Sequence, residues 1–403
     1  MKSGWAIKKL GDVCEFRRGL TYAKSDEVEA SDKVVLRANN VSLESSTLCF
    51  DELKYLRTDF NIPADKLLVK DGLLICTASG SKDHLGKVAY IDREYGFAFG
   101  GFMGLLVPRS AIVFPRYCYR LLTSSAYKDF IKGLTDGANI NNLKFSQLAE
   151  FEIPVPPLAE QKRIVAKIDA AFEKIDKLKA NAERNLANAK ELFQSALDEA
   201  MRPERGWEEK RLGEVCKVFG RGKSKHRPRN DKRLYGGPYP FIQTGDVRNA
   251  GHTIDKFTQT YSEFGLSQSK LWPKGTLCIT IAANIAETAI LGFDACFPDS
   301  VIGCVFDESK MHTGFAEYML QNYKCQLQSL GKDRSSAQPN INLGTFEDNA
   351  FPAPPLAEQR QIVKRLDSLS EKVRLLEQHY TRQIADCAEM RQSVLREAFE
   401  GRL

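Results

Sequence analysis

The hexapeptide Pro-Pro-Leu-Ala-Glu-Gln occurs twice in this chain, at residues 156–161 and at residues 354–359. It belongs to a longer repeat, because residues 154–201 align without a gap with residues 352–399 and 21 of the 48 positions are identical. A sequence repeated at a fixed offset indicates a duplicated structural unit. The chain is therefore predicted to contain one module twice, each made of a globule followed by a long helix.

A looser repeat lies upstream of each copy, where Trp5–Cys14 resembles Trp207–Cys216. In both halves it is followed by short β-rich runs separated by Gly, Asp and Asn, and then by a helical stretch. This pattern predicts a mixed α/β globule in each half. The predicted strands are Val34–Arg37, Leu73–Thr77, Lys87–Ile91, Thr276–Ile281 and Thr288–Leu291, and the predicted helices are Tyr117–Lys132 and Phe315–Leu330.

A long helix is predicted after each hexapeptide, because proline suits the first turn of a helix and no Pro or Gly follows for about 40 residues. Apolar residues there recur with a heptad period, which predicts that the two helices form a coiled coil. The alternative is that each helix packs only on its own globule. A buried pair of Asn185 and Gln383 would fix the register. The predicted seams are Ile168, Ile175, Ala182, Ala189, Ala196 with Ala171, Leu178, Asn185, Leu192, and Leu366, Val373, Tyr380, Cys387, Val394 with Leu369, Leu376, Gln383, Met390.

The predicted fold is thus α+β, with two mixed α/β globules separated by two long antiparallel coiled-coil helices and a pseudo-two-fold internal repeat. Antiparallel pairing would place the globules at opposite ends of a rigid spacer. The predicted boundaries are 1–153 for the first globule, 154–203 for the first helix, 204–351 for the second globule and 352–403 for the second helix.

The bulk properties are those of an ordinary globular protein. A chain of 403 residues can hold two or three domains, and a net charge of +6 permits a nucleic-acid partner without requiring one. The ten cysteines include no Cys-x-x-Cys pair, so neither a zinc site nor a disulfide framework is indicated. No apolar stretch reaches the roughly 20 residues of a membrane span, and the N-terminus lacks the hydrophobic core of a signal peptide. These features predict a cytoplasmic protein with no membrane partner.

Two further features accompany the repeat: the proline turn Ile153-Pro-Val-Pro-Pro-Leu-Ala-Glu-Gln161, and an Asn-rich lead-in at Ala138–Leu143 and Pro339–Leu343. Together with the long helix after each turn, they resemble the DNA-specificity (S) subunits of Type I restriction-modification systems. The resemblance covers essentially the whole chain. The second turn departs slightly from the family pattern, because Phe351-Pro-Ala replaces Ile-Pro-x.

The resemblance implies a non-catalytic subunit with two target recognition domains, each of which reads one half of a gapped site in double-stranded DNA. It also implies that the helical spacer docks two adenine-N6 methyltransferase (M) subunits, and that restriction (R) subunits join them, so that the complex methylates or cleaves DNA. S-adenosylmethionine, ATP and Mg would then bind the partner subunits. No cofactor is expected in this chain.

The DNA-binding candidates follow from side-chain chemistry, because Arg and Lys suit guanine and phosphate whereas Asn and Gln suit adenine. The alternative is that Asn-rich turns are only turns. The candidates in the first globule are Arg17, Arg18, Tyr22, Lys24, Arg37, Asn39, Asn40, Ser79, Ser81, Lys82, His84, Lys87, Asn139 and Asn141.

The second globule has a denser basic cluster, in which eight basic side chains lie between Arg221 and Arg233 against one acid, Asp231. Pro and Gly around it predict a loop, which we expect to contact mainly phosphates, although many basic loops are simply solvated. Gln243–Arg248 occupies the place that Arg37–Asn40 holds in the first half. The candidates here are Arg221, Lys223, Lys225, Arg227, Arg229, Gln243, Thr244, Arg248, Asn284 and Asn340.

The repeated hexapeptide is the candidate partner-binding motif, since the resemblance assigns subunit docking to the repeats. Its residues are Pro156, Pro157, Leu158, Glu160 and Gln161 in the first copy, and Pro354, Pro355, Leu356, Glu358 and Gln359 in the second.

Two segments resemble catalytic motifs without matching them. Gly80–Lys87 looks like a phosphate loop, but five residues separate its glycines and Val88 stands where Ser or Thr would bind magnesium. Asp299, Glu308 and Lys310 resemble the acids and lysine of a metal-dependent nuclease, with no counterpart in the first half. A nuclease is therefore an alternative function, and a coiled-coil adaptor without DNA affinity is another. No catalytic residue or metal ligand is predicted.

Overall fold

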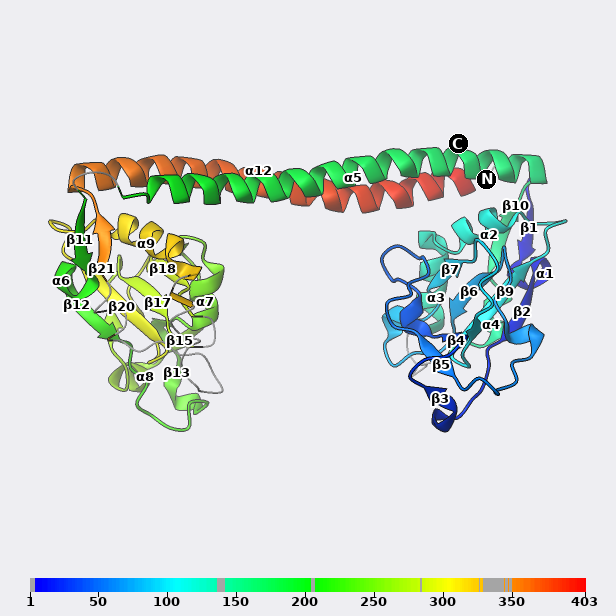
Figure 1. Cartoon of the computed structure of the whole chain (residues 1–403), viewed down its shortest axis with the longest axis horizontal. Coiled ribbons are helices and arrows are strands. Elements are labelled where there is room, and N and C mark those ends of the chain that lie inside the picture. Colours follow the sequence, from blue (N-terminus) through cyan, green and yellow to red (C-terminus); the bar gives the residue numbers. More distant parts are fainter. Residues whose placement is uncertain are drawn as a thin grey trace. The chain divides into compact units, whose positions relative to one another are not determined.

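The computed structural model describes residues 4–135, 142–203, 207–282, 285–325, 327–328, 344, 347 and 350–403. The chain divides into two compact units. Unit 1 consists of Met1–Arg184 with Thr381–Leu403, and unit 2 consists of Asn185–Tyr380. Each unit therefore contains one globule together with parts of both long helices (Figure 1).

The described residues of the unit 1 globule form two four-stranded sheets and four short α-helices, besides the β1–β10 ribbon described below. The first sheet has the strand order β2-β9-β6-β7 and the second β3-β5-β4-β8. The first sheet contains β2 (Cys14–Arg18), β9 (Met103–Pro108), β6 (Leu73–Cys76) and β7 (Val88–Tyr90); the second contains β3 (Glu27–Val28), β5 (Lys54–Leu56), β4 (Lys33–Leu36) and β8 (Ala98–Phe99); the helices are α1 (Leu10–Val13), α2 (Pro115–Leu121), α3 (Ser125–Thr135) and α4 (Phe145–Leu148).

The globule of unit 2 repeats this plan. The order β12-β20-β17-β18 matches β2-β9-β6-β7, and β15-β13-β19 matches β5-β4-β8, so the predicted duplication is confirmed. The first sheet contains β12 (Cys216–Arg221), β20 (Val301–Phe306), β17 (Leu277–Thr280), β18 (Thr288–Leu291) and β14 (Thr253–Ile254); the second contains β15 (Gln259–Tyr261), β13 (Tyr235–Phe241), β19 (Ala295–Cys296) and β16 (Leu271–Trp272); the helices are α6 (Leu212–Val215), α7 (Thr244–Asn249), α8 (Glu263–Ser267) and α9 (Thr313–Asn322).

The central strands of both globules are short apolar runs with both faces buried. In β6, Leu73 and Ile75 pack in the core that includes the long helices, whereas Leu74 and Cys76 pack in the core toward the second sheet. Alternate residues of a strand point to opposite faces, so a continuous apolar run suits a strand between two cores. The run Leu277–Thr280 of β17 is fully buried in the same way.

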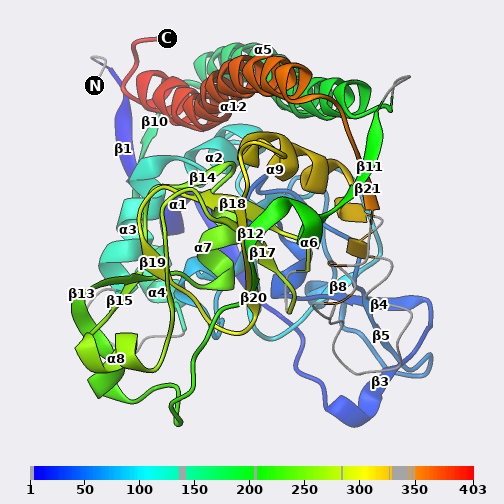
Figure 2. The same cartoon turned by 90° about the vertical axis from the view of Figure 1, so that its left-hand side faces the viewer.

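The two repeats seen in the sequence meet in space at the base of each globule. Strand β1 (Ala6–Lys9) pairs antiparallel with β10 (Glu152–Val155), so the upstream repeat lies beside the proline turn. Strand β11 (Glu208–Arg211) pairs with β21 (Ala350–Ala353) in the same manner, as Figure 2 shows. Each ribbon connects its globule to the start of a long helix.

The long helices are α5 (Leu158–Ala200) and α12 (Leu356–Phe399), each free of Pro and Gly. They pack antiparallel within each unit, as the prediction required. In unit 1, Asp176 of α5 forms an ion pair with Arg391 of α12. In unit 2, the carboxylate of Glu199 lies 3.6 Å from the guanidinium of Arg365. Within unit 1, Arg163 of α5 also donates to the carbonyl oxygen of Leu403, just beyond α12, so the lower residue number on one helix meets the higher number on the other.

One column of the predicted coiled-coil seam is wrong by one residue. The positions from Ile168 to Ala189 are buried as predicted. In the other column, Leu178 and Leu192 are exposed, and the buried or half-buried residues are Phe172 and Phe193, each one residue after a predicted position. In α12, Leu376, Gln383 and Met390 are likewise exposed, whereas Val363 and Ala398, on the row shifted by one residue, are buried. Because Gln383 is exposed, the buried polar pair with Asn185 is also wrong.

Two predicted helices differ from the observed ones. The stretch Tyr117–Lys132 is two helices, α2 and α3, because the side chain of Ser124 bonds the carbonyl of Leu121 and ends the first. Helix α9 ends at Asn322, and after a turn at Tyr323 helix resumes at residues 324–325 and 327–328; the predicted end, Leu330, lies outside the described residues. Within the described residues, no helix has the length and hydropathy of a membrane span.

Candidate nucleic-acid interface

Each globule has a cavity on its side away from the long helices, where β4 and β13 lie in Figure 1. Corresponding segments line both. In the first globule they are the loop after β2, the end of β4 and the loop between β8 and β9, around a cavity of about 600 Å³. In the second they are the loop after β12, the end of β13 and the loop between β19 and β20, around about 580 Å³. The duplicated fold thus produces a duplicated cavity.

Glycine permits the close packing of these loops. A Cβ atom on Gly19 would lie 2.0 Å from the carbonyl oxygen of Gly100. A Cβ atom on Gly222 would lie 2.2 Å from the carbonyl oxygen of Phe297. No side chain fits at such distances, so both loops depend on glycine at corresponding positions.

Arg37 and Gln243 hold the same place in the two cavities. Each follows a strand that pairs in parallel with its neighbour, β4 with β8 and β13 with β19. The Arg37 N–H donates to Asn40 Oδ1 over 2.8 Å, and the Gln243 N–H donates to Asp246 Oδ2 over 2.8 Å. This local bond fixes the backbone at each strand end. The side chain, which differs between the two globules, lines the cavity.

The first cavity brings together three of the predicted DNA-binding residues. Tyr22, Lys24 and Arg37 line it, along with Phe102 of the β8–β9 loop. The Phe102 side chain is 72% exposed, yet its carbonyl oxygen accepts bonds from the N–H groups of Thr77 and Ala78 and from the Thr77 hydroxyl. Its position is therefore fixed by the backbone while its ring faces solvent.

Two predicted residues of the first globule have internal structural roles instead. Asn40 is 1% exposed, and its amide nitrogen donates to the carbonyl oxygens of Cys49 and Glu52. The Lys87 ammonium donates to the carbonyl oxygen of Val41 over 2.7 Å, and burial lowers its pKa. The burial of Asn40 contradicts a DNA contact by that residue, whereas Lys87 is half-buried and its contact with DNA stays a prediction.

The remaining candidates of the first globule lie outside the cavity lining. Arg17 pairs with Glu15 at 2.7 Å, and Arg18 lies over the Phe145 ring. Ser79, Ser81, Lys82 and His84 belong to the loop after β6, and Asn39 is exposed beside Glu52. Asn139 and Asn141 lie outside the described residues.

In the second globule, the lone acid of the basic cluster organises its loop. Asp231 accepts hydrogen bonds from the backbone N–H and the guanidinium of Arg233, and it lies 2.8 Å from Nε2 of His226. The bonds from Arg233, with that from His226, hold the pKa of the Asp231 carboxyl well below its usual range. Phe264 packs against both His226 and Arg233. The loop is therefore a folded structure.

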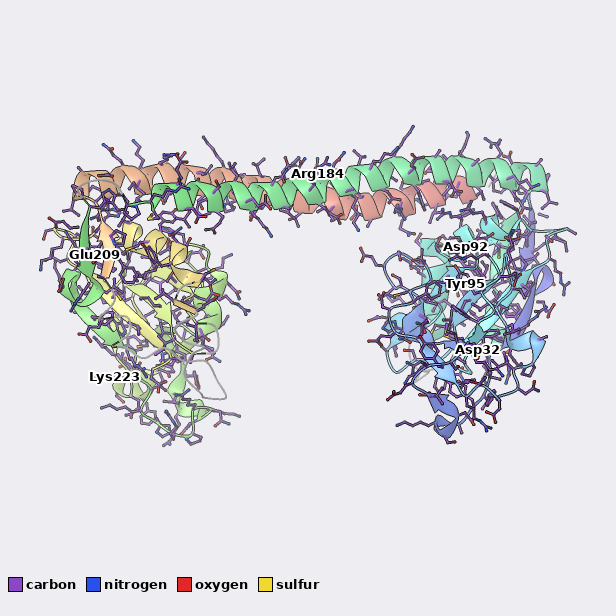
Figure 3. All side chains as sticks on the ribbon, in the orientation of Figure 1. Asp32, Asp92, Tyr95, Arg184, Glu209 and Lys223 are labelled. Atoms are coloured by element: carbon purple, nitrogen blue, oxygen red, sulfur yellow. The ribbon has the colours of Figure 1, made fainter. Side chains whose placement is uncertain are left out.

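The basic side chains of this loop differ in their freedom. Arg229 forms an ion pair with Asp299 at 2.8 Å, and Arg227 donates to carbonyl oxygens of its own loop. Arg221, Lys223 and Lys225 are exposed, and Lys223 lies on the side of the globule away from the helices in Figure 3. The remaining candidates are divided: Gln243 and Thr244 line the cavity, Arg248 is exposed on α7, and Asn284 and Asn340 lie outside the described residues.

Sequence reasoning missed three residues of this region. Gln259 of β15 accepts a bond from the Gln243 amide over 2.8 Å, Phe102 projects from a glycine-rich turn, and Asp231 holds the basic loop. The available signals were the Gly-Gly pair before Phe102 and the single acid inside a basic run. Nothing in the sequence pattern pairs Gln243 with Gln259, because they come from different strands.

The structure does not support the two near-catalytic motifs. Asp299 precedes β20 and Glu308 follows it, and Asp299 is paired with Arg229 whereas Glu308 accepts from Thr313. A six-residue strand places its ends roughly 20 Å apart, too far for one metal ion. The described residues contain no cluster of His, Cys, Asp and Glu suited to a metal. In Gly80–Lys87, the terminal lysine is bound to Val41, so no phosphate loop forms.

The repeated glutamine fastens each globule to its helix. Gln161 is fully buried; its side-chain oxygen accepts from the Phe114 N–H, and its amide donates to Ile112 O and Pro156 O. Gln359, also fully buried, accepts from the His312 N–H and donates to Pro354 O. We call each arrangement a glutamine clamp. Buried polar side chains that are fully hydrogen-bonded specify a single packing.

Partner contact through the whole hexapeptide is therefore contradicted. Gln161, Gln359, Pro156 and Pro354 are buried, so their side chains are inaccessible in this fold. Leu158 and Leu356 are half-buried, Glu160 pairs with Arg163 at 2.6 Å, and Glu358 accepts from the Trp207 ring nitrogen. Pro157 and Pro355 are exposed.

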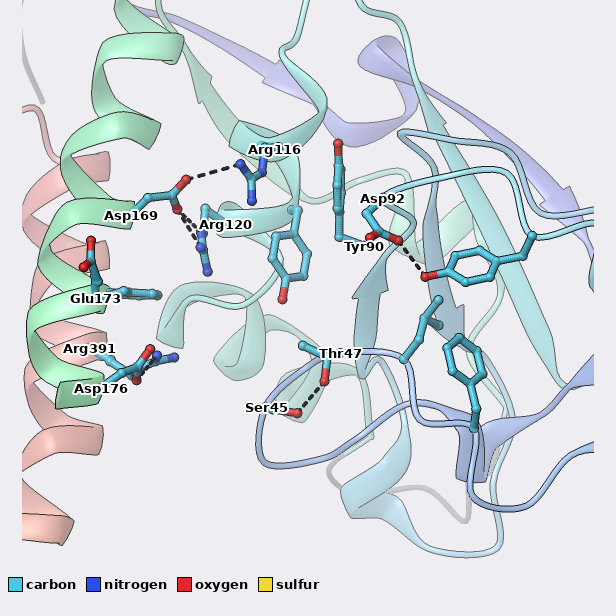
Figure 4. A pocket seen from close by; sticks show the side chains of 15 residues that line it. Ser45, Thr47, Tyr90, Asp92, Arg116, Arg120, Asp169, Glu173, Asp176 and Arg391 are labelled. Atoms are coloured by element: carbon cyan, nitrogen blue, oxygen red, sulfur yellow. Dashed lines mark hydrogen bonds and ion pairs between the residues drawn. The ribbon is translucent and has the colours of Figure 1, made fainter. Parts of the chain in front are cut away.

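A second junction in each unit differs between the copies. In unit 1, Arg120 of α2 bonds Asp169 of α5 over 2.6 Å, and Arg116 lies 3.6 Å from the same carboxylate, as Figure 4 shows. In unit 2 the corresponding pair is Tyr318 and Asp367, joined by a hydrogen bond of 2.7 Å. The positions correspond because each pair is offset by the same 198 residues as the hexapeptides.

The unit 2 junction also contains a pair formed by a half-buried histidine and a buried glutamate. His252 stacks on Tyr318, and its Nδ1 lies 2.8 Å from a carboxylate oxygen of Glu317, which is fully buried. Burial raises the pKa of Glu317. Burial by itself would lower the pKa of His252, but the hydrogen bond and charge of Glu317 outweigh it and raise that pKa.

Comparisons with known proteins agree with this architecture. Residues 2–186 and 204–384 match the family described as Type I restriction modification DNA specificity domain. The chain is 26% identical to the Type I restriction enzyme StySPI specificity subunit of Salmonella potsdam and 25% identical to the EcoKI specificity subunit of Escherichia coli K12, each covering 100% of this chain and 90% of the relative.

Two solved structures share the fold. One, from a study titled as the structural basis of complex assembly and conformational transition of the type I R-M system, gives a TM-score of 0.81 at 21% identity and covers 100% of this chain and 99% of its own. The HsdS subunit of Thermoanaerobacter tengcongensis gives 0.61 at 19% identity, with 100% and 98% covered. The chain belongs to the family of DNA-specificity subunits of type I restriction-modification systems.

Proposed function

We propose that each globule reads one half of a gapped DNA site through its cavity and the loops around it. The observation that carries this proposal is the duplicated cavity, which has the same backbone frame but different side chains in the two globules. Recognition of two different half-sites needs that combination. Members of this family select the DNA sequence while other subunits of the complex carry out the chemistry.

The exposed lysines and arginines of the basic loop are suited to phosphate contact, and the cavity side chains to base contact. Phosphate contacts position a protein on DNA, whereas contacts to base edges carry the sequence information. In the first globule we propose Tyr22, Lys24 and Arg37 as contacts. In the second we propose Lys223 and Lys225 for phosphate and Gln243 for a base. The target recognition domains would be residues 1–153 and 204–351.

We further propose that the helices dock two methyltransferase subunits through exposed apolar positions. Leu178 and Leu192 of α5 are 54% and 52% exposed, and their repeat equivalents in α12, Leu376 and Met390, are 39% and 46% exposed. Exposed apolar groups repeated at equivalent positions indicate an interaction surface. Each unit contains one residue from each helix, Leu178 with Met390 and Leu192 with Leu376, which fits two copies of one partner.

Native mass spectrometry of the co-expressed complex tests this docking. We expect Leu178→Asp combined with Met390→Asp to remove one methyltransferase subunit and leave the other bound. Lys174→Asp, an exposed change on the same helix, is the control and should leave both in place. Two subunits retained by the double variant, or two lost, would contradict one docking surface per unit.

The rest of the complex follows the family. Restriction subunits would join the methyltransferase core, and S-adenosylmethionine, ATP and Mg would bind those partners in the cytoplasm. The helices would set the gap between half-sites. An insertion of four residues lengthens α5 by roughly 6 Å and rotates the part of the helix beyond it by about 40° past one full turn. We expect it to change the gap or abolish methylation; an unchanged gap with unchanged methylation yield would refute the spacer role.

The nuclease and adaptor alternatives remain testable in the same preparations. The chain with its methyltransferase partner should bind DNA with a strong dependence on salt, because phosphate contacts release counterions. Absence of DNA binding would favour an adaptor. Cleavage of plasmid by the isolated chain with magnesium, lost in Asp299→Ala, would favour a nuclease.

A further inference from the structure

The inference in this section rests on the reading function proposed above. We propose that Arg37 and Gln243 are corresponding specificity-determining residues: Arg37 selects guanine in one half-site, and Gln243 selects adenine in the other. Substituting one residue type for the other should therefore change one base of the target and leave the rest of both half-sites intact.

The first step is that the two backbones correspond. Each residue precedes a short helix and donates its N–H to the side chain three positions later, Asn40 or Asp246. Each lines its cavity next to the loop whose glycine, Gly19 or Gly222, packs against the opposite turn. A side chain grafted from one position to the other thus starts from the same backbone geometry.

The second step is that the Arg37 guanidinium is uncommitted. The described residues provide it with no hydrogen bond or ion pair, and its Nε is buried without a partner. Glu27 of the same cavity wall pairs with Lys54, at 3.0 Å, and not with Arg37. A guanidinium has only donors, and guanine presents two acceptors, O6 and N7, in the major groove.

The third step is that Gln243 is oriented by a second amide. Its side-chain nitrogen donates one hydrogen to Gln259 Oε1 over 2.8 Å. The nitrogen keeps a second hydrogen, and the Gln243 oxygen has no partner among the described residues. This donor and acceptor match N7 and N6 of adenine, the pair that a glutamine recognises. The Gln259 contact limits the rotation of the amide and so favours adenine over other bases.

The experiment uses the complete complex in a host that lacks other adenine methyltransferases. Genomic N6-methyladenine is mapped for the parent chain and for Gln243→Arg, Gln243→Ala and Arg37→Gln. Asn249→Arg is the matched control, because it adds a charge on the same helix α7 but outside the cavity lining. A bidentate contact discriminates between bases by roughly 1–3 kcal/mol, or about five- to 150-fold.

We expect Gln243→Arg to change one adenine of one half-site to guanine, Gln243→Ala to relax that same position, and Arg37→Gln to change one guanine to adenine in the other half-site. Asn249→Arg should leave the motif unchanged. If Gln243→Arg gives no methylation, Gln243→Ala and Arg37→Gln decide, again by whether one base of the methylated motif changes. An unchanged bipartite motif in Gln243→Ala and Arg37→Gln would overturn this inference alone. Loss of the bipartite motif in the parent would overturn the proposed function itself.

Discussion

The two globules share one backbone arrangement but have different side chains in their cavities. The glutamine clamp is repeated with the same residue, Gln161 or Gln359, and with partners at equivalent positions. The cavity position is also repeated, but it holds Arg37 in one globule and Gln243 in the other. The difference shows how a duplicated fold can serve an asymmetric target: buried contacts preserve the geometry, and the side chains that line the cavities on that geometry are free to differ.

The largest effect on stability is expected from removing a glutamine clamp, which both units share. Gln161→Ala or Gln359→Ala leaves buried backbone groups without partners, so each should lower the free energy of unfolding of its unit by about 2–4 kcal/mol. Gln194→Ala, an exposed change on α5, should alter it by less than about 0.5 kcal/mol. Hydrogen exchange of each unit is the measurement. If one substitution destabilises its unit and the other does not, the two glutamine clamps do not have the same structural role.

The next effect separates the two helix junctions. Arg120→Ala removes an ion pair whose arginine is 16% exposed and also lies over the Phe172 ring, so we expect a loss of about 1–3 kcal/mol that shrinks in 1 M salt. Tyr318→Phe removes one hydrogen bond and should cost about 1 kcal/mol at any salt concentration. Chemical denaturation at two salt concentrations decides. Equal salt dependence of the two variants would contradict this distinction.

A smaller effect concerns DNA affinity. Lys223→Ala with Lys225→Ala should weaken binding about tenfold for all sequences and flatten the salt dependence, since these exposed lysines are the proposed phosphate contacts of the basic loop. Arg211→Ala, an exposed change on β11, is the control and should have no effect. Titrations of specific and unrelated duplexes at several salt concentrations measure this. A changed target sequence at unchanged affinity would show that the loop reads bases.

The smallest effect is a pH dependence confined to unit 2. The pKa of His252 is raised in the fold, so its stabilisation is fully present below its unfolded pKa of about 6.5 and is lost as pH rises through the folded pKa. We expect the melting temperature of unit 2 to fall by a few degrees as the pH rises through the folded pKa of His252. The variant His252→Gln should remove this pH dependence. Fluorescence of Trp207 and Trp272 in a Trp5→Phe variant reports it. If the melting temperature of His252→Gln depends on pH as strongly as that of the parent, another group causes the dependence.

The sequence predicted the duplication, the proline turns and the long helices, because repeats and apolar periodicity are local signals. It predicted β18 at Thr288–Leu291 with the observed bounds. It placed one seam column wrongly, because α5 and α12 are apolar on more than one side: Leu178 and Leu376 look like seam residues but are exposed. Periodicity alone does not distinguish a face that packs on a helix from one that is left free.

The candidate site was predicted only in outline. Arg37 and Gln243 were matched correctly by their place in the repeat, and the structure brings Tyr22 and Lys24 to the same cavity as Arg37. Asn40 was misassigned, because the sequence does not reveal that its side chain is buried and bonds backbone carbonyls. The Gln243–Gln259 contact depends on strand pairing between β13 and β15, which is a property of the folded chain.

The most direct test is a genomic map of N6-methyladenine in the host with this chain present and with it deleted. Our account predicts one bipartite motif with a fixed gap, methylated only when the chain is present. A continuous motif, or a motif that persists after deletion, would contradict the claim that two globules on one helical frame each read half of the target.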